Sequence, residues 1–164
     1  MWTCVFALWT LSVLQNPAAQ TGTIAGKLTP PDGPISRPAQ VILLSGEFLE
    51  MFNTDVLERL DNYWERYKPT FIQQKELFLV VQKMAYRDAF QRAVTLMRQD
   101  NRTRSANFLG DSTADGKFEF KNVPVGRYKI LALGRAGNEE VVWQDSVDLT
   151  SSLPLYVQLK KTIP

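Results

Sequence analysis

The stretch Asp115–Ala132, DGKFEFKNVPVGRYKILA, decides the fold of this chain. Asp115–Gly116 is a tight-turn dipeptide, because glycine adopts a positive φ without steric cost. Phe118 and Phe120 then alternate with charged side chains, which predicts a strand with one apolar face and one solvated face. A Pro-Val-Gly turn at 124–126 ends that strand, and a second strand follows. The stretch therefore indicates a β-sheet protein, and it contains no catalytic motif.

The composition is that of an ordinary globular protein, and it excludes several kinds of active site. The chain has 164 residues, of which 45% are hydrophobic and 22% are charged, and its net charge of +2 gives no sign of nucleic-acid binding. Histidine is absent, which excludes a histidine general base, a Ser-His-Asp triad and a histidine-ligated zinc site. Cys4 is the single cysteine, so an internal disulfide is excluded as well. We expect no cofactor and no metal.

The N-terminal residues resemble a secretory signal peptide. An apolar run from Trp2 to Leu14 precedes Asn16–Gln20, where small residues suit signal peptidase. The run is shorter than the about 20 residues that a membrane span needs. No Lys or Arg precedes the run, and the alternative is a buried N-terminal strand or helix. We predict a signal peptide at 1–20 and an exported chain, secreted or periplasmic, without a membrane span after cleavage.

The remainder of the chain has strand patterns on both sides of a helical segment. Residues 22–45 contain two strand patterns separated by a turn rich in proline and glycine, and residues 105–159 contain further strands separated by turns. About seven short strands favour a β-sandwich over an α/β fold. Between them, residues 47–104 change to the helical period of 3.6.

The helical segment predicts two helices. Asp55 with Glu58 fits a capping box at the start of the first helix, and Pro69 ends that helix. Thr70 then caps a second helix, which either continues for about 30 residues or breaks near residues 86–88. An unbroken helix of that length exceeds the depth of a small sandwich, so part of the pair would project beyond it.

The strand segments resemble a carboxypeptidase regulatory-like domain, a transthyretin-like β-sandwich with a carbohydrate-binding-like fold that is common in exported bacterial proteins. The similarity lies in residues 22–28 and 39–43, and above all in the string Gly-x-Phe-x-Phe-x-x-Val-Pro-x-Gly-x-Tyr at 116–128. Collagen-adhesin B-type repeats share the general pattern. In the typical family domain the second strand leads quickly to the third, so the helical segment is a departure, and loop entropy tolerates such insertions.

The resemblance and the strand count together give the expected fold. We predict a mainly β, seven-stranded antiparallel Greek-key β-sandwich of the prealbumin or immunoglobulin type at 21–164, interrupted by an α-helical hairpin at 47–104. We expect a function specific to this protein to depend on the insertion, because the family resemblance does not extend to it.

Aromatic side chains concentrate around the expected turn between the two helices. Tyr63, Trp64, Tyr67 and Phe71 are the candidate ligand or partner contacts, because aromatic faces stack on sugars and on protein partners. The alternative is that these rings join the two helices to each other and to the sandwich, since their spacing matches a buried seam. Trp143 is expected to lie inside the sandwich.

Charged groups give no stronger candidate. The acidic side chains at 111–119 do not have the spacing of a calcium loop, and those at 58–65 alternate with basic residues, as on a solvated helix face. Basic side chains from Lys83 to Arg104 fit the C-terminal end of a helix better than a nucleic-acid site.

These observations predict a non-enzymatic β-sandwich module with a structural or recognition role at the bacterial cell envelope, where it binds a protein or a glycan. A carbohydrate-binding module that uses exposed aromatic side chains is the alternative, and a hydrolase that uses only carboxylates is the less favoured one. Exposure of Trp64, Tyr67 or Trp143 would support the glycan alternative. An apolar patch on the hairpin would support binding of a partner protein.

Overall fold

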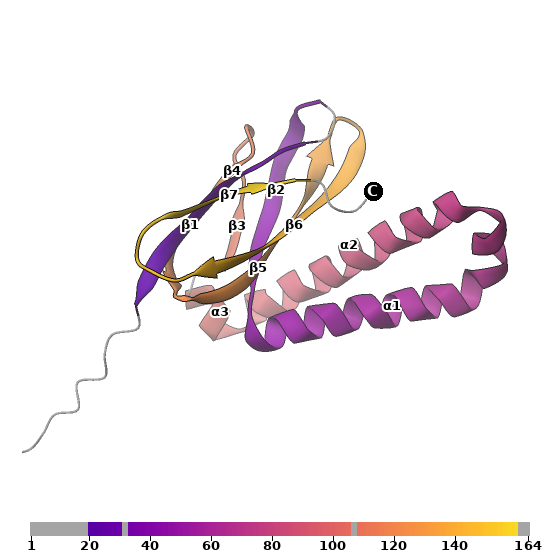
Figure 1. The fold of residues 1–164 in the computed structure, drawn as a ribbon, viewed down its shortest axis with the longest axis horizontal. Helices are drawn as coiled ribbons and strands as arrows, with labels where there is room; N and C mark the ends of the chain where they lie inside the picture. The colour runs from indigo at the N-terminus through magenta and orange to yellow at the C-terminus, as the bar shows by residue number, and fades with distance from the viewer. Residues whose placement is uncertain (1–19, 31–32, 106–107, 161–164) are drawn as a thin grey trace, which may run out of the picture.

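A computed structural model describes residues 20–30, 33–105 and 108–160, so nearly all of the expected signal peptide lies outside the described residues. The described part contains seven strands and three helices, shown in Figure 1. Their bounds are β1 Thr21–Leu28, β2 Ile35–Leu44, α1 Gly46–Gln73, α2 Lys75–Gln99, α3 Asn101–Ser105, β3 Leu109–Asp111, β4 Lys117–Pro124, β5 Gly126–Ala136, β6 Glu139–Leu149 and β7 Leu155–Leu159. Helices and strands cover nearly equal lengths of chain, so the protein is β-rich but carries more helix than a mainly β protein.

The strands form two sheets with a common core. One sheet has the order β4-β1-β7 and the other has the order β3-β2-β5-β6. Neighbouring strands are antiparallel except for β1 and β7, which run parallel. The expectation of a wholly antiparallel arrangement is wrong at this pair. The chain crosses from one sheet to the other between β6 and β7, and a crossover of this kind allows a parallel neighbour where a tight hairpin does not.

The core between the sheets contains the tryptophan that the sequence placed there. Trp143 in β6 is fully buried, and its indole Nε1 donates a hydrogen bond to the carbonyl oxygen of Thr29 at 2.9 Å. A buried indole N–H needs such an acceptor, because an unpaired polar group in the core costs free energy. The other large side chains of this core come from both sheets and include Ile24, Leu28, Val41, Leu43, Phe118, Phe120, Ile130 and Leu159.

The turn at Asp115–Gly116 is present, but it joins the two sheets and does not make a hairpin. Gly116 has a φ of +82°, and its amide donates to the carbonyl oxygen of Thr113 at 2.9 Å. The turn connects β3 with β4, which lie in different sheets, and the turn at 124–126 likewise connects β4 with β5 in the other sheet. The predicted tight turn therefore carries the chain from one sheet to the other, and the edges of the strands that it joins do not pair.

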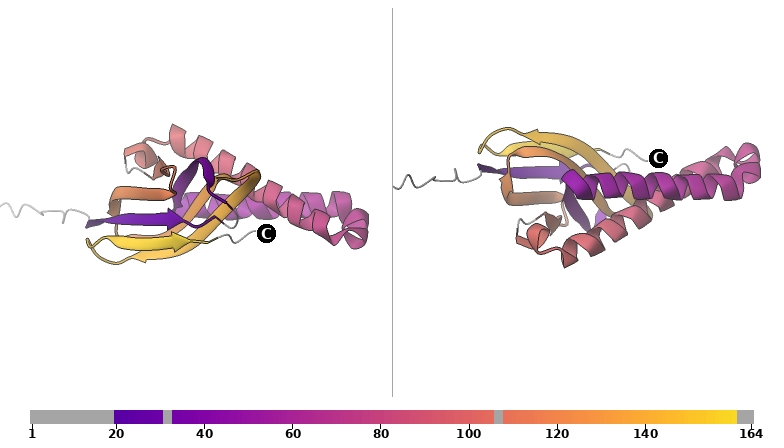
Figure 2. Two further views of the ribbon diagram at one scale, coloured as in Figure 1. Left: turned by 90° about the horizontal axis from the view of Figure 1, so that it is seen from above. Right: turned by 90° about the horizontal axis from the view of Figure 1, so that it is seen from below.

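The helical insertion covers one sheet and then extends past it. Its proximal half, residues 46–60 and 86–105, packs on the outer face of the four-stranded sheet. This second core contains Ile42, Leu44, Phe52, Val56, Ala89, Phe90, Ala93, Val94, Met97 and Leu131. The distal half, residues 61–85, extends beyond the strands in Figure 1 and in both views of Figure 2. The hairpin thus packs at its base and projects at its tip.

The first helix starts earlier than the capping pattern predicts. It begins at Gly46 after Ser45, and Asp55 lies inside the helix with its side chain buried. The expected N-cap at Asp55 is wrong because the helix already begins at Gly46, and the carboxylate pairs instead with Arg59 of α1 and Arg92 of α2. Sequence spacing alone does not reveal such a partner when it lies on another helix.

The first helix also ends later than expected, since it continues through Pro69 to Gln73. A proline inside a helix removes one hydrogen bond and usually ends the helix. Here the turn that follows buries Phe71 among neighbouring rings, and this packing offsets the lost bond. Thr70 therefore lies within α1, and α2 begins at Lys75 without a side-chain cap and runs unbroken to Gln99.

Candidate functional site

Exposed apolar side chains gather on the hairpin, most of them on its distal half and Leu57 just before it. Ten large apolar side chains of the described residues are exposed, and seven of these lie on α1 or α2 between residues 57 and 84. Large exposed apolar patches on soluble proteins mark interaction sites. We call these seven the distal apolar surface: Leu57, Trp64, Tyr67, Ile72, Leu79, Val80 and Met84.

The four aromatic residues singled out by the sequence lie together on α1. Tyr63 stacks on Tyr67 with ring centroids 6.4 Å apart, and Trp64 stacks on Phe71 with centroids 5.9 Å apart. Phe71 also meets Phe78 of α2 edge to face at 5.8 Å. These rings join the two helices to each other, as one part of the seam interpretation expects, because aromatic pairs in these geometries attract beyond their buried area. The ring contacts described above lie within the hairpin and do not involve the sandwich.

The aromatic cluster is nevertheless partly accessible. Phe71 is only 4% exposed, whereas Trp64 and Tyr67 are 38% and 39% exposed. Phe71 therefore supports the other rings, and Trp64 and Tyr67 are the members that a partner could touch. Phe78 completes the cluster from α2 and was not among the predicted site residues. The sequence does place Phe78 in the apolar period of the second helix and in the aromatic set around the turn, but not among the candidate contacts.

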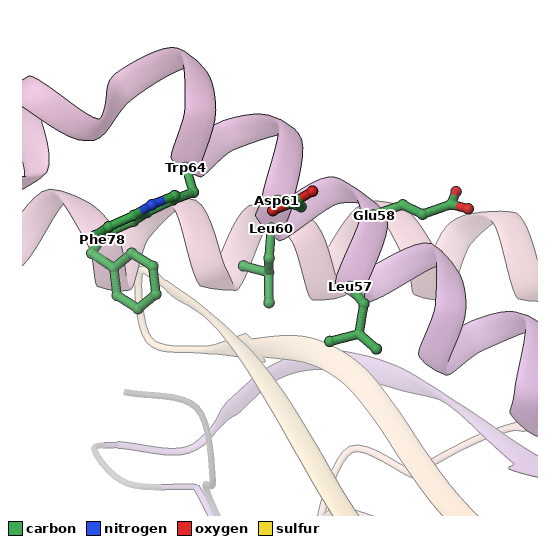
Figure 3. Close-up of a pocket in the computed structure, with 6 residues that line it drawn as sticks. All are labelled: Leu57, Glu58, Leu60, Asp61, Trp64 and Phe78. Carbon is green, nitrogen blue, oxygen red and sulfur yellow. The ribbon is translucent and has the colours of Figure 1, made fainter.

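An open pocket of about 580 Å³ lies beside this cluster. Figure 3 shows Leu57 and Leu60 pointing to the same side of α1, with the Trp64 ring lying over Phe78. The pocket is lined by Leu57, Glu58, Leu60, Asp61, Trp64 and Phe78. The floor is apolar, and both carboxylates are exposed. Such a pocket suits an apolar group that carries a positive charge at one end.

The buried acidic side chain of the hairpin has a structural role. The two oxygens of Asp55 accept hydrogen bonds from Arg59 Nε at 3.1 Å and from Arg92 Nη1 at 2.8 Å. Arg59 also approaches Asp88 of α2 at 3.9 Å. Since guanidinium groups occupy both oxygens of Asp55, this carboxylate clamps α1 to α2.

A second depression lies over the three-stranded sheet. Tyr156 of β7 and Glu119 of β4 flank Ala25 of β1 in register, and the small alanine leaves space between them. The depression measures about 410 Å³ and also reaches Asp111 and Thr113. Tyr156 is 67% exposed. The alternation Leu155-Tyr-Val-Gln-Leu159 could have placed Tyr156 on the solvated face, but sequence analysis did not single it out.

The turn beside this depression is held by a charged pair. Asp115 forms an ion pair with Lys117 at 2.7 Å and accepts a hydrogen bond from the hydroxyl of Thr113 at 2.5 Å. The hydrogen bond from Lys117, followed by that from Thr113, lowers the pKa of Asp115 to about 2. Because both donors stabilise the carboxylate, this group stays ionised and holds the turn that leads into β4.

Neither a metal site nor a membrane-spanning helix is found in the part of the chain that the structure describes. No three or more His, Cys, Asp or Glu side chains of those residues are grouped so that they could hold a metal ion. No helix there is both long and apolar enough to cross a membrane.

Comparison with known proteins gives little beyond this geometry. No protein-family model and no curated protein sequence matches the chain. The family resemblance inferred from the strand motifs is therefore not confirmed.

Two solved structures have a low similarity to this chain. A proposed carbohydrate-binding protein from Pseudomonas aeruginosa is 14% identical, with a TM-score of 0.39, over 87% of this chain and 90% of that one. The full-length major pilin of Streptococcus pneumoniae is 16% identical, with a TM-score of 0.28, over 87% of this chain. This chain spans about a third of the pilin, 31% of its length. Both TM-scores are below 0.5, so these similarities support no conclusion about function.

Proposed function

We propose that this chain is a non-enzymatic recognition module, exported to the bacterial cell envelope, in which a Greek-key β-sandwich presents the distal apolar surface of its hairpin to a partner protein. The observation that supports this proposal most directly is the concentration of exposed apolar side chains on one projecting element. A monomer gains nothing from leaving such side chains in water, because burial of one large apolar side chain contributes about 1.5–3 kcal/mol.

The base of the hairpin is suited to hold this surface in place. The second core fixes the proximal half on the sheet, and Asp55 clamps α1 to α2. The aromatic cluster then ties the distal halves of the helices together. A binding surface on a rigid element loses little conformational entropy on binding. Tryptophan and tyrosine are also the residues that most often dominate binding energy, which fits Trp64 and Tyr67.

The test compares two full-length variants that each remove exposed apolar side chains. In the first, Leu57→Ser, Ile72→Ser and Val80→Ser remove part of the distal apolar surface. In the second, Val125→Ser and Leu153→Ser remove exposed apolar side chains of the β-domain and serve as the control. We expect the first variant to lose proteins that the wild-type chain captures from an envelope extract by chemical crosslinking, and the control to keep them. Equal capture by both variants would overturn the proposal.

Glycan binding is the second candidate function, and the depression over the three-stranded sheet favours it. An exposed tyrosine beside a small residue, with carboxylates and a hydroxyl at the rim, offers a stacking face and hydrogen-bond acceptors for a sugar. Trp64 is less suited to this task because Phe71 stacks on it and Phe78 meets it edge to face. The test is a glycan microarray followed by calorimetry. Tyr156→Ala should abolish binding and Trp64→Ala should preserve it; retention of binding by Tyr156→Ala would exclude this depression as the sugar site.

A carboxylate-only hydrolase has the least support. Glu58 and Asp61 both line the pocket on α1, but both are exposed and the pocket is open. A general acid at neutral pH needs a carboxyl group that burial keeps protonated. These two groups are better suited to attracting a positive charge.

A further inference from the structure

We propose that the partner of the distal apolar surface is a second copy of this chain, which packs its α1 antiparallel to the first. This inference rests on the proposed function and identifies the partner protein as the same chain. It depends on the order of the side chains along α1, because the exposed side chains of one α1 are complementary to those of a second α1 that runs in the opposite direction.

One stripe of α1 carries five exposed side chains. Leu57, Asp61, Trp64, Lys68 and Ile72 follow one another at intervals of four, three, four and four residues, and all are exposed. At 100° per residue they fall within an arc of about 80° on the helix. Leu57 and Ile72 at the two ends are 66% and 68% exposed. The stripe has the spacing of a helix–helix contact, yet no other element of the described chain covers these ends.

When a second copy of α1 packs antiparallel to the first, about a two-fold axis near Trp64, opposite charges face each other and apolar side chains face apolar side chains. Leu57 then lies opposite the partner's Ile72, and Asp61 lies opposite the partner's Lys68. The match is exact in register, because each apolar residue stands four positions from its charged neighbour. A two-fold axis repeats both contacts, so that one pairing produces two apolar and two ionic contacts.

The charges in this stripe are available for a partner. Among the described residues, neither the side chain of Asp61 nor that of Lys68 forms an ion pair or hydrogen bond within its own chain. The pocket of about 580 Å³ lies beside Asp61, and its apolar floor suits the methylene stem of the partner's Lys68. The ammonium would then reach the carboxylates of Asp61 and Glu58 near the Trp64 ring, where a cation–π contact adds to the attraction.

The projection of the hairpin leaves room for this arrangement. The distal half extends past the sheets, so an antiparallel pair places the two β-domains at opposite ends. A hairpin that lay wholly on its own sheet would have no such free length. The geometry therefore points to a dimer joined through its hairpins, with the open face of each three-stranded sheet left accessible.

Sedimentation analysis of the full chain tests the inference, because it measures self-association without another partner. We expect the wild-type chain to form a dimer as its concentration rises to about 0.5 mM. Asp61→Lys and Lys68→Asp should each weaken the dimer about tenfold or more, since each variant places like charges together at two symmetric positions. Arg66→Asp, which makes the same charge change outside the stripe, should leave the dimer unchanged.

A mixture of the two weakened variants provides the decisive result. Asp61→Lys has two lysines in the stripe and Lys68→Asp has two aspartates, so an antiparallel pair of one with the other restores both ionic contacts. The mixture should dimerise at least as strongly as wild type, and the double variant Asp61→Lys/Lys68→Asp should also recover. Circular dichroism establishes that each variant is folded.

The outcomes separate this inference from the proposed function. A wild-type chain that stays monomeric overturns the inference, as does a mixture that remains weak. Crosslinking in the envelope extract would still support the proposed function if it captured a different protein that depends on the distal apolar surface. If Asp61→Lys and Lys68→Asp both leave the dissociation constant of the dimer unchanged, the proposed register is likewise overturned.

Discussion

Asp55 in α1 and Arg92 in α2, 37 residues apart in sequence, are joined by a hydrogen bond of 2.8 Å between a buried carboxylate and a guanidinium. Arg59 occupies the other oxygen of the same carboxylate at 3.1 Å. The position lies where the hairpin rests on the sheet, next to Val56 of the second core. The two helices are therefore fixed to each other at the base, from which the distal half projects.

Replacement of this carboxylate should weaken the whole protein. Asp55→Asn keeps the shape of the side chain but removes its charge and leaves two guanidinium groups facing an amide. We expect the free energy of unfolding to fall by about 1–3 kcal/mol, measured by urea denaturation. Glu65→Gln is the control, because that exposed carboxylate has no ion pair within the described chain and lies outside the stripe, and its effect should stay within about 0.5 kcal/mol. Equal effects of the two substitutions would contradict a clamp at Asp55.

Close packing at Gly26 gives a second prediction. A Cβ atom at this position would lie 2.4 Å from the carbonyl oxygen of Val157 and 2.5 Å from the ring of Phe118. Gly26→Ala should therefore lower the free energy of unfolding by about 1–3 kcal/mol, because the backbone of β7 cannot move away freely. Gly110→Ala is the matched control, since its nearest neighbour is the ring of Phe120 at an ordinary 3.4 Å. A stable Gly26→Ala variant would show that β1 and β7 are less tightly packed.

The turn at Asp115 should respond to acid. The pKa of Asp115 is lowered to about 2 from an ordinary value of 3.8, so its favourable interactions are fully present above about pH 4 and disappear as the pH falls through 2. A titration followed by carboxyl-carbon NMR should find this low pKa in the wild-type chain. Lys117→Met should move the pKa back toward 3.8, and Thr113→Val should produce a smaller rise. An unchanged pKa in Lys117→Met would exclude the ion pair as its main cause.

The aromatic cluster should stabilise the distal half of the hairpin against local unfolding without affecting its base. Phe71→Ala removes the ring that connects Trp64, Tyr67 and Phe78. We expect amide hydrogen exchange at residues 61–85 to become at least about tenfold faster, because local opening requires less free energy. Exchange in the β-domain should change little. Uniform acceleration across the chain would mean that the distal half and the β-domain open as one unit.

The sequence predicted those parts of the fold that depend on local pattern. The alternation of Phe118 and Phe120 with charged side chains predicted β4, and the glycine at 116 has the positive φ that the turn requires. The change of period at residues 47–104 located the helical insertion. These features depend on neighbours in sequence, so that a single stretch is enough to recognise them.

The errors involve contacts that a local sequence pattern does not reveal. Asp55 resembled a helix cap because its partner Arg92 lies on another helix. Pro69 resembled a helix end because the burial of Phe71 in the next turn depends on rings of both helices. The parallel pairing of β1 with β7 likewise joins the first and last strands. For the candidate site, the aromatic residues of α1 were found from sequence, but their unequal exposure follows from packing against Phe78.

The helical hairpin also has a consequence for how the chain reaches its folded state. β2 and β3 are neighbours in the sheet, with Val41 opposite Gly110, although the entire insertion separates them in sequence. If the insertion were a flexible loop, it would slow the pairing of β2 with β3, although its cost in stability grows only slowly with length. α1 and α2 contact each other through residues close to their shared turn, such as Phe71 and Phe78. The hairpin can therefore form first and bring Gly46 near Ser105. The folded insertion would then hold the ends of β2 and β3 close together before they pair. Substitutions that weaken the contact between α1 and α2 should therefore slow the formation of the four-stranded sheet.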